Sequence, residues 1–119
     1  MTKRVMIVDD DKEFLEELQE SLVLDEYEVI TVTDPKTALQ TAMETRPDVV
    51  LLDITMPEES GFQVACEIKY FSGLKDTSII AMTGFFKERY ATLMKGYGFK
   101  GFLKKPFDHL DLICKIEEN

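Results

Sequence analysis

The run Val49-Val50-Leu51-Leu52-Asp53 decides which fold the sequence is expected to adopt. Four consecutive apolar residues leave no polar face, whereas a strand with one solvated side alternates apolar and polar residues. The run is typical of a central parallel strand that helices cover on both sides. Arg46-Pro47-Asp48 precedes it and ends a helical pattern, because proline disfavours the α conformation of the residue before it. We therefore expect a buried strand whose carboxyl end carries Asp53.

The chain before this strand alternates between strand and helix patterns. Val5 to Val8 is a short apolar run, and Asp9-Asp10-Asp11 follows it. From Lys12 onward apolar residues recur every four positions with glutamates between them, which predicts an amphipathic helix. Glu28 to Val32 alternates with β-branched residues and predicts a second strand. Asp34-Pro35 supplies an N-cap and an N1 proline for a second helix. The apolar stripe of that helix is Ala38, Leu39, Ala42 and Met43.

The chain after Asp53 continues the alternation. A polar loop from Thr55 to Gly61 leads to a third helix, which carries Phe62, Ala65 and Ile68. The fourth strand, fourth helix and fifth strand are expected at Ile79 to Met82, around Phe86 to Lys95 and at Gly101 to Lys104. Asp108 caps a last helix, which carries Leu110, Ile113 and Ile116. Five strands that alternate with five helices predict one α/β domain with a parallel sheet and right-handed crossovers.

Composition and charge narrow the class of protein. The 119 residues are 45% hydrophobic and 31% charged, which is typical of one globular domain. The net charge of −9 repels phosphates and anionic lipids, so we expect neither direct nucleic-acid binding nor membrane binding. Because no apolar run approaches the roughly 20 residues of a membrane span, and no signal peptide is evident, we expect a cytoplasmic protein. Cys66 and Cys114 lack metal-ligand spacing and are interpreted as buried free thiols.

Polar residues gather at the carboxyl ends of the expected strands. Asp9 and Asp10 follow the first strand, Asp53 ends the third, Thr83 the fourth and Lys105 the fifth. In an open doubly wound sheet, ligands bind outside these ends, where the winding direction reverses. For a strand order of 2-1-3-4-5, that point lies between strands one and three. The order would bring Asp10 beside Asp53.

These residue types together suit phosphoryl transfer. Three carboxylates in one cleft repel each other, and a hard divalent cation such as Mg²⁺ would keep them ionised. A lysine and a hydroxyl can neutralise phosphoryl oxygens while a carboxylate acts as nucleophile. Each piece also has an ordinary structural explanation: Asp9-Asp10-Asp11 can be a helix cap, and Asp53 a turn residue. The convergence of several strand ends on one rim favours a functional site.

Four segments resemble the response-regulator receiver domain of two-component signal transduction, and the chemotaxis regulators within it. They are 5–11 (VMIVDDD), 49–57 (VVLLDITMP), 80–84 (IAMTG) and 102–107 (FLKKPF). The resemblance extends from Lys3 to about Glu117. It implies a single receiver domain over 1–119 with a flavodoxin-like doubly wound sheet of order 2-1-3-4-5 and five helices.

The resemblance also implies roles for individual residues. Asp53 would accept a phosphoryl group from a histidine kinase or a histidine phosphotransfer protein. Mg²⁺ would bind to Asp10, Asp53 and the backbone carbonyl of Thr55, with Asp9 acting through water. Thr83 and Lys105 would each hold a phosphoryl oxygen.

Further roles implied by the family concern the switch and its output. The Lys105-Pro106 bond would be cis, and Phe102 would be the aromatic switch residue that turns inward with Thr83. Phe85 occupies a position that controls water access, so we expect it to slow dephosphorylation. The surface of the fourth helix, fifth strand and fifth helix would then bind a downstream protein or a second copy.

Three interpretations remain open at this point. The first is the signalling switch, which catalyses only its own phosphorylation and dephosphorylation. The second is a Mg²⁺-dependent phosphohydrolase with an aspartyl-phosphate intermediate, and the third a receiver-like module that accepts no phosphate. Seven of the twelve aromatic residues lie from Phe85 to Phe107, either as core or as a docking face. Intact Asp10, Asp53, Thr83 and Lys105 favour the switch.

Overall fold

The computed structural model describes residues 3–55, 61–71, 73–85 and 87–119. The strands are β1 (Arg4–Val8), β2 (Glu28–Val32), β3 (Val49–Asp53), β4 (Ser78–Thr83) and β5 (Phe99–Lys104). The helices are α1 (Lys12–Leu24), α2 (Ala38–Thr45), α3 (Gly61–Phe71), α4 (Glu88–Gly96) and α5 (His109–Glu117), with a short 3₁₀ helix η1 (Pro35–Thr37) before α2. Within these ranges no helix is long and apolar enough to cross a membrane.

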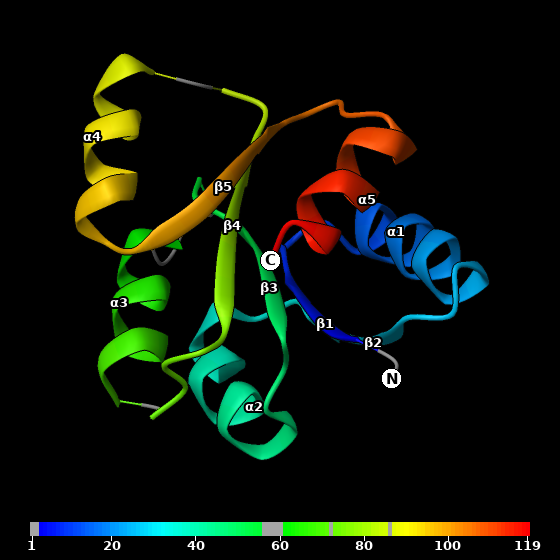
Figure 1. The fold of residues 1–119 in the computed structure, drawn as a ribbon, viewed down its shortest axis with the longest axis horizontal. Coiled ribbons are helices and arrows are strands. Elements are labelled where there is room, and N and C mark those ends of the chain that lie inside the picture. Colours follow the sequence, from blue (N-terminus) through cyan, green and yellow to red (C-terminus); the bar gives the residue numbers. More distant parts are fainter. Residues whose placement is uncertain (1–2, 56–60, 72, 86) are drawn as a thin grey trace.

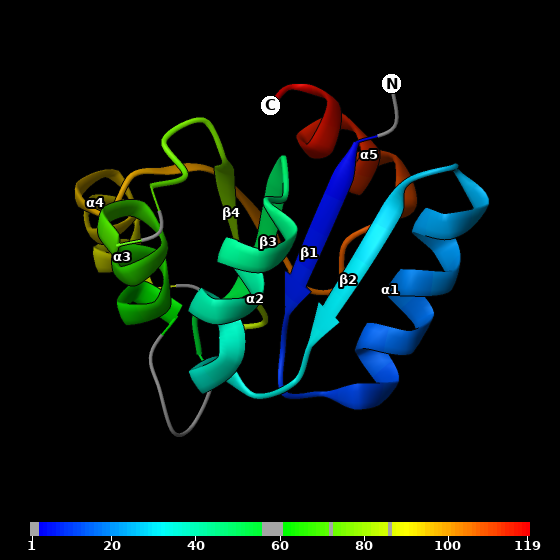
Figure 2. The same cartoon turned by 90° about the horizontal axis from the view of Figure 1, so that it is seen from below.

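The strands form one five-stranded sheet in the order β2-β1-β3-β4-β5, and each pair is parallel. Helices α1 and α5 cover one face of the sheet, and α2, α3 and α4 cover the other (Figures 1 and 2). The predicted α/β class, the doubly wound flavodoxin-like arrangement and the strand order are all confirmed.

The central strand β3 is buried on both faces, as its unbroken apolar run predicted. Val50 and Leu52 belong to the core shared with α2 and α3, whereas Val49 and Leu51 belong to the core shared with α1 and α5. This alternation follows the two-residue period of a strand. Because both faces are covered, the polar residue that follows, Asp53, lies at the end of an element with little freedom to move.

The helix boundaries agree with the capping residues, with one correction. Asp11 caps α1 by accepting from the Phe14 backbone N–H, and Asp108 caps α5 by accepting from that of Asp111. Asp34 accepts from the Lys36 N–H, but it begins the 3₁₀ helix η1, and α2 starts only at Ala38. The predicted second helix therefore begins with a tighter turn.

Four residues that were predicted to be buried lie on more exposed faces of their helices. They are Met43, Cys66, Leu110 and Cys114. Leu110 is 70% exposed and Met43 is 44% exposed, so neither belongs to the core. The buried stripe of α5 is instead Leu112 and Ile116, which are four residues apart on one helix face. Cys114 is exposed and Cys66 is partly buried; both are free, but neither is a buried thiol.

Three strands and one helix differ from the sequence-based bounds. Strand β1 begins at Arg4, one residue before the predicted start at Val5. Strand β5 begins at Phe99, before Gly101, and β4 extends from Ser78 to Thr83. Helix α4 begins at Glu88; the predicted start at Phe86 lies outside the described residues.

Candidate phosphoryl-transfer site

Strand register brings the predicted site residues to one edge of the sheet. Val8 pairs with Leu52, so Asp9 follows directly beside Asp53, which itself pairs with Met82. Thr83 pairs with Lys104, and the Lys105 N–H donates to the Thr83 carbonyl at 2.8 Å. Four neighbouring strand ends therefore deliver carboxylates, a hydroxyl and an ammonium to the same rim.

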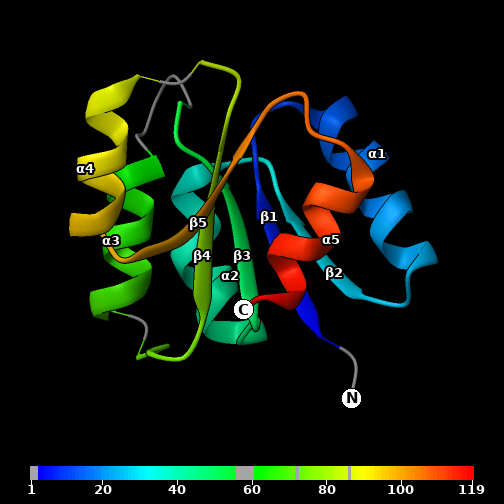
Figure 3. The same cartoon turned by 45° about the horizontal axis from the view of Figure 1, so that its top comes forward.

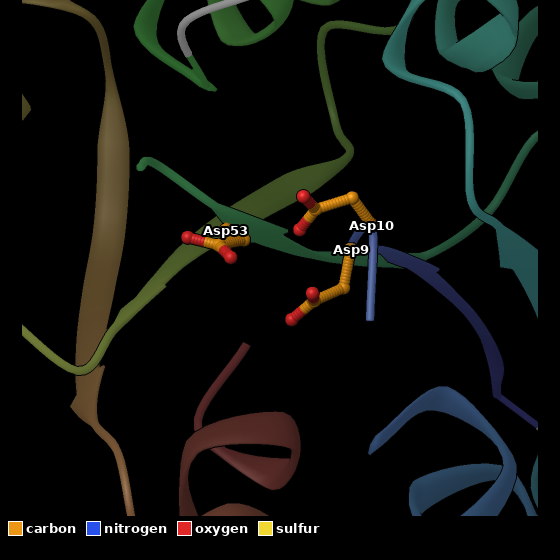
Figure 4. A group of neighbouring side chains, drawn as sticks. All are labelled: Asp9, Asp10 and Asp53. Atoms are coloured by element: carbon orange, nitrogen blue, oxygen red, sulfur yellow. The ribbon is translucent and has the colours of Figure 1, made fainter. Parts of the chain in front are cut away.

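Three carboxylates form the centre of this rim. Oxygen atoms of Asp9, Asp10 and Asp53 lie within 4.8 Å of one another. Figure 4 shows them at the adjoining ends of β1 and β3. Asp9 and Asp53 are buried, whereas Asp10 is exposed. The expected placement of Asp10 beside Asp53 is thus present in the structure.

Lys105 supplies the positive charge. Its ammonium is 2.5 Å from Asp9 Oδ2 and 3.5 Å from Asp53 Oδ2, and its side chain is 21% exposed. The Lys105-Pro106 peptide bond is cis, as the resemblance implied. The chain leaves β5 and crosses above the sheet towards α5 at this point (Figure 3). One ammonium thus offsets part of the repulsion among the three carboxylates.

Asp9 carries the perturbed carboxyl of the cluster. Burial raises the pKa of Asp9 above its ordinary value, and the nearby Asp53 carboxylate adds to the rise. The hydrogen bonds from Lys105 and from the Asp11 N–H act in the opposite direction without cancelling the effect of burial. A buried anion of this kind needs further positive charge.

The acceptor candidate Asp53 is held by the residue two positions later. The Thr55 backbone N–H donates to Asp53 Oδ1 at 2.9 Å, and the Thr55 hydroxyl donates to the same atom at 2.8 Å. Asp53 Oδ2 remains on the side of Lys105. The two oxygens therefore have different surroundings. The resemblance implied roles for the Thr55 carbonyl and for its position in water access, but not this hydroxyl contact.

Thr83 is fully buried at the end of β4. Its hydroxyl oxygen accepts from the Phe85 N–H at 3.0 Å and donates to the Phe85 carbonyl at 3.3 Å. The donated bond is longer than a typical O–H···O bond, so little free energy is lost if the hydroxyl turns elsewhere. Thr83 is thus tied to the loop after β4.

The oxygen-only donor set fits a hard divalent cation. Mg²⁺ binds carboxylates and keeps several waters, and Asp10 is exposed enough to leave room for them. Among the described residues, Asp9, Asp10 and Asp53 are the one group of acidic, histidine or cysteine side chains close enough to share an ion. The residues present therefore fit the implied Mg²⁺, which Asp10 and Asp53 would hold.

Most of the described aromatic residues between 85 and 107 are partly buried against the core. Phe102 is half-buried against Ala81 and Met94. The ring of Phe62 in α3 contacts the rings of Tyr90, Tyr97 and Phe99, at centroid distances of 5.4 to 5.8 Å. Phe85 is the exception, with 65% of its surface exposed. Packing thus explains most of this group, and Phe86 lies outside the described residues.

Two side-chain contacts, one at the site and one between α5 and α1, had no signal in the sequence. The Lys105 ammonium lies 4.1 Å from the ring centroid of Phe14, a residue that the sequence marks only as part of a helix stripe. His109, at the start of α5, bonds Ser21 at 2.8 Å and Asp25 at 2.5 Å, linking α5 to α1. Both contacts join residues far apart in the chain, where periodicity carries no information.

Comparison with known proteins agrees with this geometry. The family described as the response regulator receiver domain matches residues 5–117. The chain is 33% identical over 114 residues to the transcriptional regulatory protein PrrA of Mycobacterium leprae, covering 96% of this chain and 48% of that protein. It thus spans about half the length of the curated relatives it matches.

Solved structures show the same fold. The chemotaxis protein CheY4 of Vibrio cholerae superimposes with a TM-score of 0.93 at 29% identity, over 99% of this chain and 98% of that one. The receiver domain of the sensor histidine kinase PA1611 from Pseudomonas aeruginosa, described with magnesium in its active-site cleft, gives 0.87 at 23% identity, over 99% and 97%. With the family match spanning nearly all of β1 to α5, the chain belongs to the response regulator receiver domains of two-component systems.

Proposed function

We propose that this chain is a phosphorylation-activated switch in which Asp53 accepts a phosphoryl group from a histidine kinase or a histidine phosphotransfer protein. The observation that carries the proposal is the convergence of Asp53, two further carboxylates and Lys105 at the carboxyl ends of the strands. The proposed cofactor is Mg²⁺, supported by the oxygen donor set and by the magnesium named for the PA1611 receiver domain. A cytoplasmic location goes with these proposed partners.

The proposed transfer uses the two oxygens of Asp53 differently. One oxygen attacks phosphorus, the bond from phosphorus to the donor's nitrogen or oxygen breaks, and the electron pair leaves with the donor. Thr55 fixes the Asp53 carboxylate through two hydrogen bonds to Oδ1, which orients the carboxylate before the attack. Lys105 lies 3.5 Å from Oδ2 and is placed to neutralise a phosphoryl oxygen. Bound Mg²⁺ would neutralise further charge on the transferred group.

The proposed switch begins at Thr83. Its hydroxyl is tied to the Phe85 carbonyl by a 3.3 Å bond, which is weak enough to exchange for a phosphoryl oxygen. Movement of Thr83 would pull the loop after β4 and change the space around Phe102, which packs against Ala81 and Met94. A phosphoryl group that binds better in one loop arrangement shifts an existing equilibrium between two states.

We further propose that α4, β5 and α5 form the output surface for a downstream protein or a second copy. Strand β5 is at the edge of the sheet. Phe85, which precedes α4, and Leu93 on α4 are exposed apolar residues. Direct nucleic-acid binding is not part of the proposal, because the net charge is −9. The chain is proposed to act only on its own acyl phosphate, not as a general enzyme.

The test is intact-protein mass after incubation with Mg²⁺ and acetyl phosphate. The wild type is expected to gain one phosphoryl group, and Asp53→Ala is expected to gain none. The control is Asp76→Ala, which removes an exposed aspartate before the start of β4 and should gain as much as wild type. No gain in wild type would favour the module that accepts no phosphate. Rapid continuous release of inorganic phosphate would favour the phosphohydrolase.

A further inference from the structure

The Lys105 ammonium has a third neighbour besides the two carboxylates. It lies over the ring of Phe14, 4.1 Å from the centroid, while 2.5 Å separate it from Asp9 and 3.5 Å from Asp53. A cation over an aromatic face within about 6 Å is attracted by the negative face of the ring. The ammonium is thus held between two anions and one neutral surface.

Phe14 is itself fixed in place. It lies in the first turn of α1, where its backbone N–H donates to the capping carboxylate of Asp11 at 3.2 Å. Its ring meets that of Phe107 edge-on, with centroids 6.0 Å apart and an interplanar angle of 86°. Phe107 follows Lys105 by two residues, so the ring packs against the same segment whose lysine it contacts. Phe14 therefore presents a fixed face to the ammonium.

A neutral contact for the Lys105 ammonium matters because a divalent cation would compete with the ammonium for the carboxylates. A divalent cation on Asp10 and Asp53 would weaken the attraction between Lys105 and the carboxylates. The flexible lysine side chain would then be held less firmly, with Asp9 as its remaining carboxylate partner. An aromatic face attracts an ammonium but offers no oxygen to a strongly hydrated hard cation. The ring can therefore hold the lysine without competing for the metal.

We propose that Phe14 is a positioning residue that keeps the Lys105 ammonium aimed at the phosphoryl group on Asp53. This inference rests on the proposed function and adds a residue to it. Phe14 itself does not touch the reacting atoms; it acts only through Lys105. In the transfer from acetyl phosphate, an Asp53 oxygen bonds to phosphorus, the bond from phosphorus to the acetate oxygen breaks, and acetate leaves with the electron pair. Lys105 stabilises the charge on the transferred group throughout.

The first test compares phosphorylation rates at saturating Mg²⁺. Phe14→Leu removes the ring face and is expected to slow phosphorylation about two- to tenfold, the range of a partly exposed cation–π contact. Phe14→Tyr keeps the face and is expected to restore the rate to within about twofold. A pocket of about 180 Å³ beside Phe14, lined also by Leu18 and Ser21, leaves space for the added hydroxyl. The matched control is Phe99→Leu, a half-buried phenyl at the far end of β5, with an expected wild-type rate.

The second test separates the ring's electrostatics from its shape. Mono-, di- and trifluorinated phenylalanines at position 14 keep the shape and weaken the negative face in steps, so the logarithm of the rate should fall in steps. In the metal-free protein, ring-current shifts of the Lys105 ε-methylene protons should be present in wild type and absent in Phe14→Leu.

The outcomes separate the two proposals. If wild type takes up no phosphoryl group, the proposed function fails and the role of Phe14 fails with it. If wild type is phosphorylated but Phe14→Leu reacts equally fast, or the fluorinated series is flat, only the role of Phe14 is overturned. Absence of a Lys105 ring-current shift in wild type would also overturn it.

Discussion

Replacement of Gly61 by alanine is predicted to disrupt the packing of the start of α3 against the end of β3, which carries Asp53. A β-carbon on Gly61 would lie 2.4 Å from the Asp53 carbonyl oxygen and 2.5 Å from the Ile54 α-carbon. Both atoms are backbone, so no side-chain rotation relieves the overlap. Ordinary contacts of a β-carbon begin at 3.4 Å, so α3 and the end of β3 must separate by roughly the difference.

The expected cost follows from the size of this overlap. Overpacking in a dense core typically costs about 1–3 kcal/mol of stability. We expect a cost near the upper end of this range, because the added β-carbon overlaps backbone atoms, which cannot rotate away. We expect Gly61→Ala to lower the free energy of unfolding by about 3 kcal/mol. Displacement of Asp53 should also slow its phosphorylation.

The assay is urea denaturation of Gly61→Ala beside a matched Gly96→Ala variant. Gly96 is the last residue of α4, and a β-carbon added there would meet no other atom within 4 Å, so alanine should stabilise the helix by about 0.5–1 kcal/mol. A loss of stability in Gly61→Ala and a gain in Gly96→Ala would show that the close contact at Gly61, and not the glycine-to-alanine change itself, causes the loss. A Gly61→Ala stability within about 1 kcal/mol of wild type would refute it.

Three other perturbations have defined expectations. Phe85→Ala should shorten the lifetime of the phosphorylated protein severalfold, because an exposed ring beside Thr83 would no longer hinder water; an unchanged lifetime in a decay assay would contradict this. Burial raises the pKa of Asp9, so its contribution to stability is lost as the pH rises through that pKa. In urea titrations of the metal-free protein, the free energy of unfolding of Asp9→Asn should therefore exceed that of wild type at neutral pH but not below pH 3.8, the ordinary pKa of aspartate. Exposed Cys114 should react with a thiol reagent in the native state faster than Cys66, as peptide mapping would show.

The fold could be predicted because its strands carry strong local patterns. The apolar run 49–52 predicted a strand with helices on both faces. Polar residues at the ends of successive strands predicted one site at the carboxyl edge of the sheet. Strand register then places Asp9 beside Asp53 and Thr83 beside Lys104 without further information. These parts depend on the two-residue period of a strand, which the sequence displays directly.

The parts that could not be predicted depend on contacts between distant segments. Lys105 meets Phe14 because the segment between β5 and α5 passes beside the first turn of α1, and helical periodicity marks Phe14 only as an apolar residue. The exposure of Leu110 depends on how α5 is rotated against the sheet, where two overlapping stripes had similar hydrophobicity. The close approach at Gly61 is also a tertiary contact, which a glycine in a polar loop does not reveal.

The most direct test of the central claim is to locate the phosphoryl group chemically. Borohydride reduces an aspartyl phosphate to homoserine but leaves a free aspartate unchanged. After incubation with Mg²⁺ and acetyl phosphate, reduction and digestion, we predict homoserine at position 53 and aspartate at positions 9 and 10. Unmodified aspartate at position 53 alongside a phosphorylated residue elsewhere would contradict the assignment of Asp53 as the acceptor.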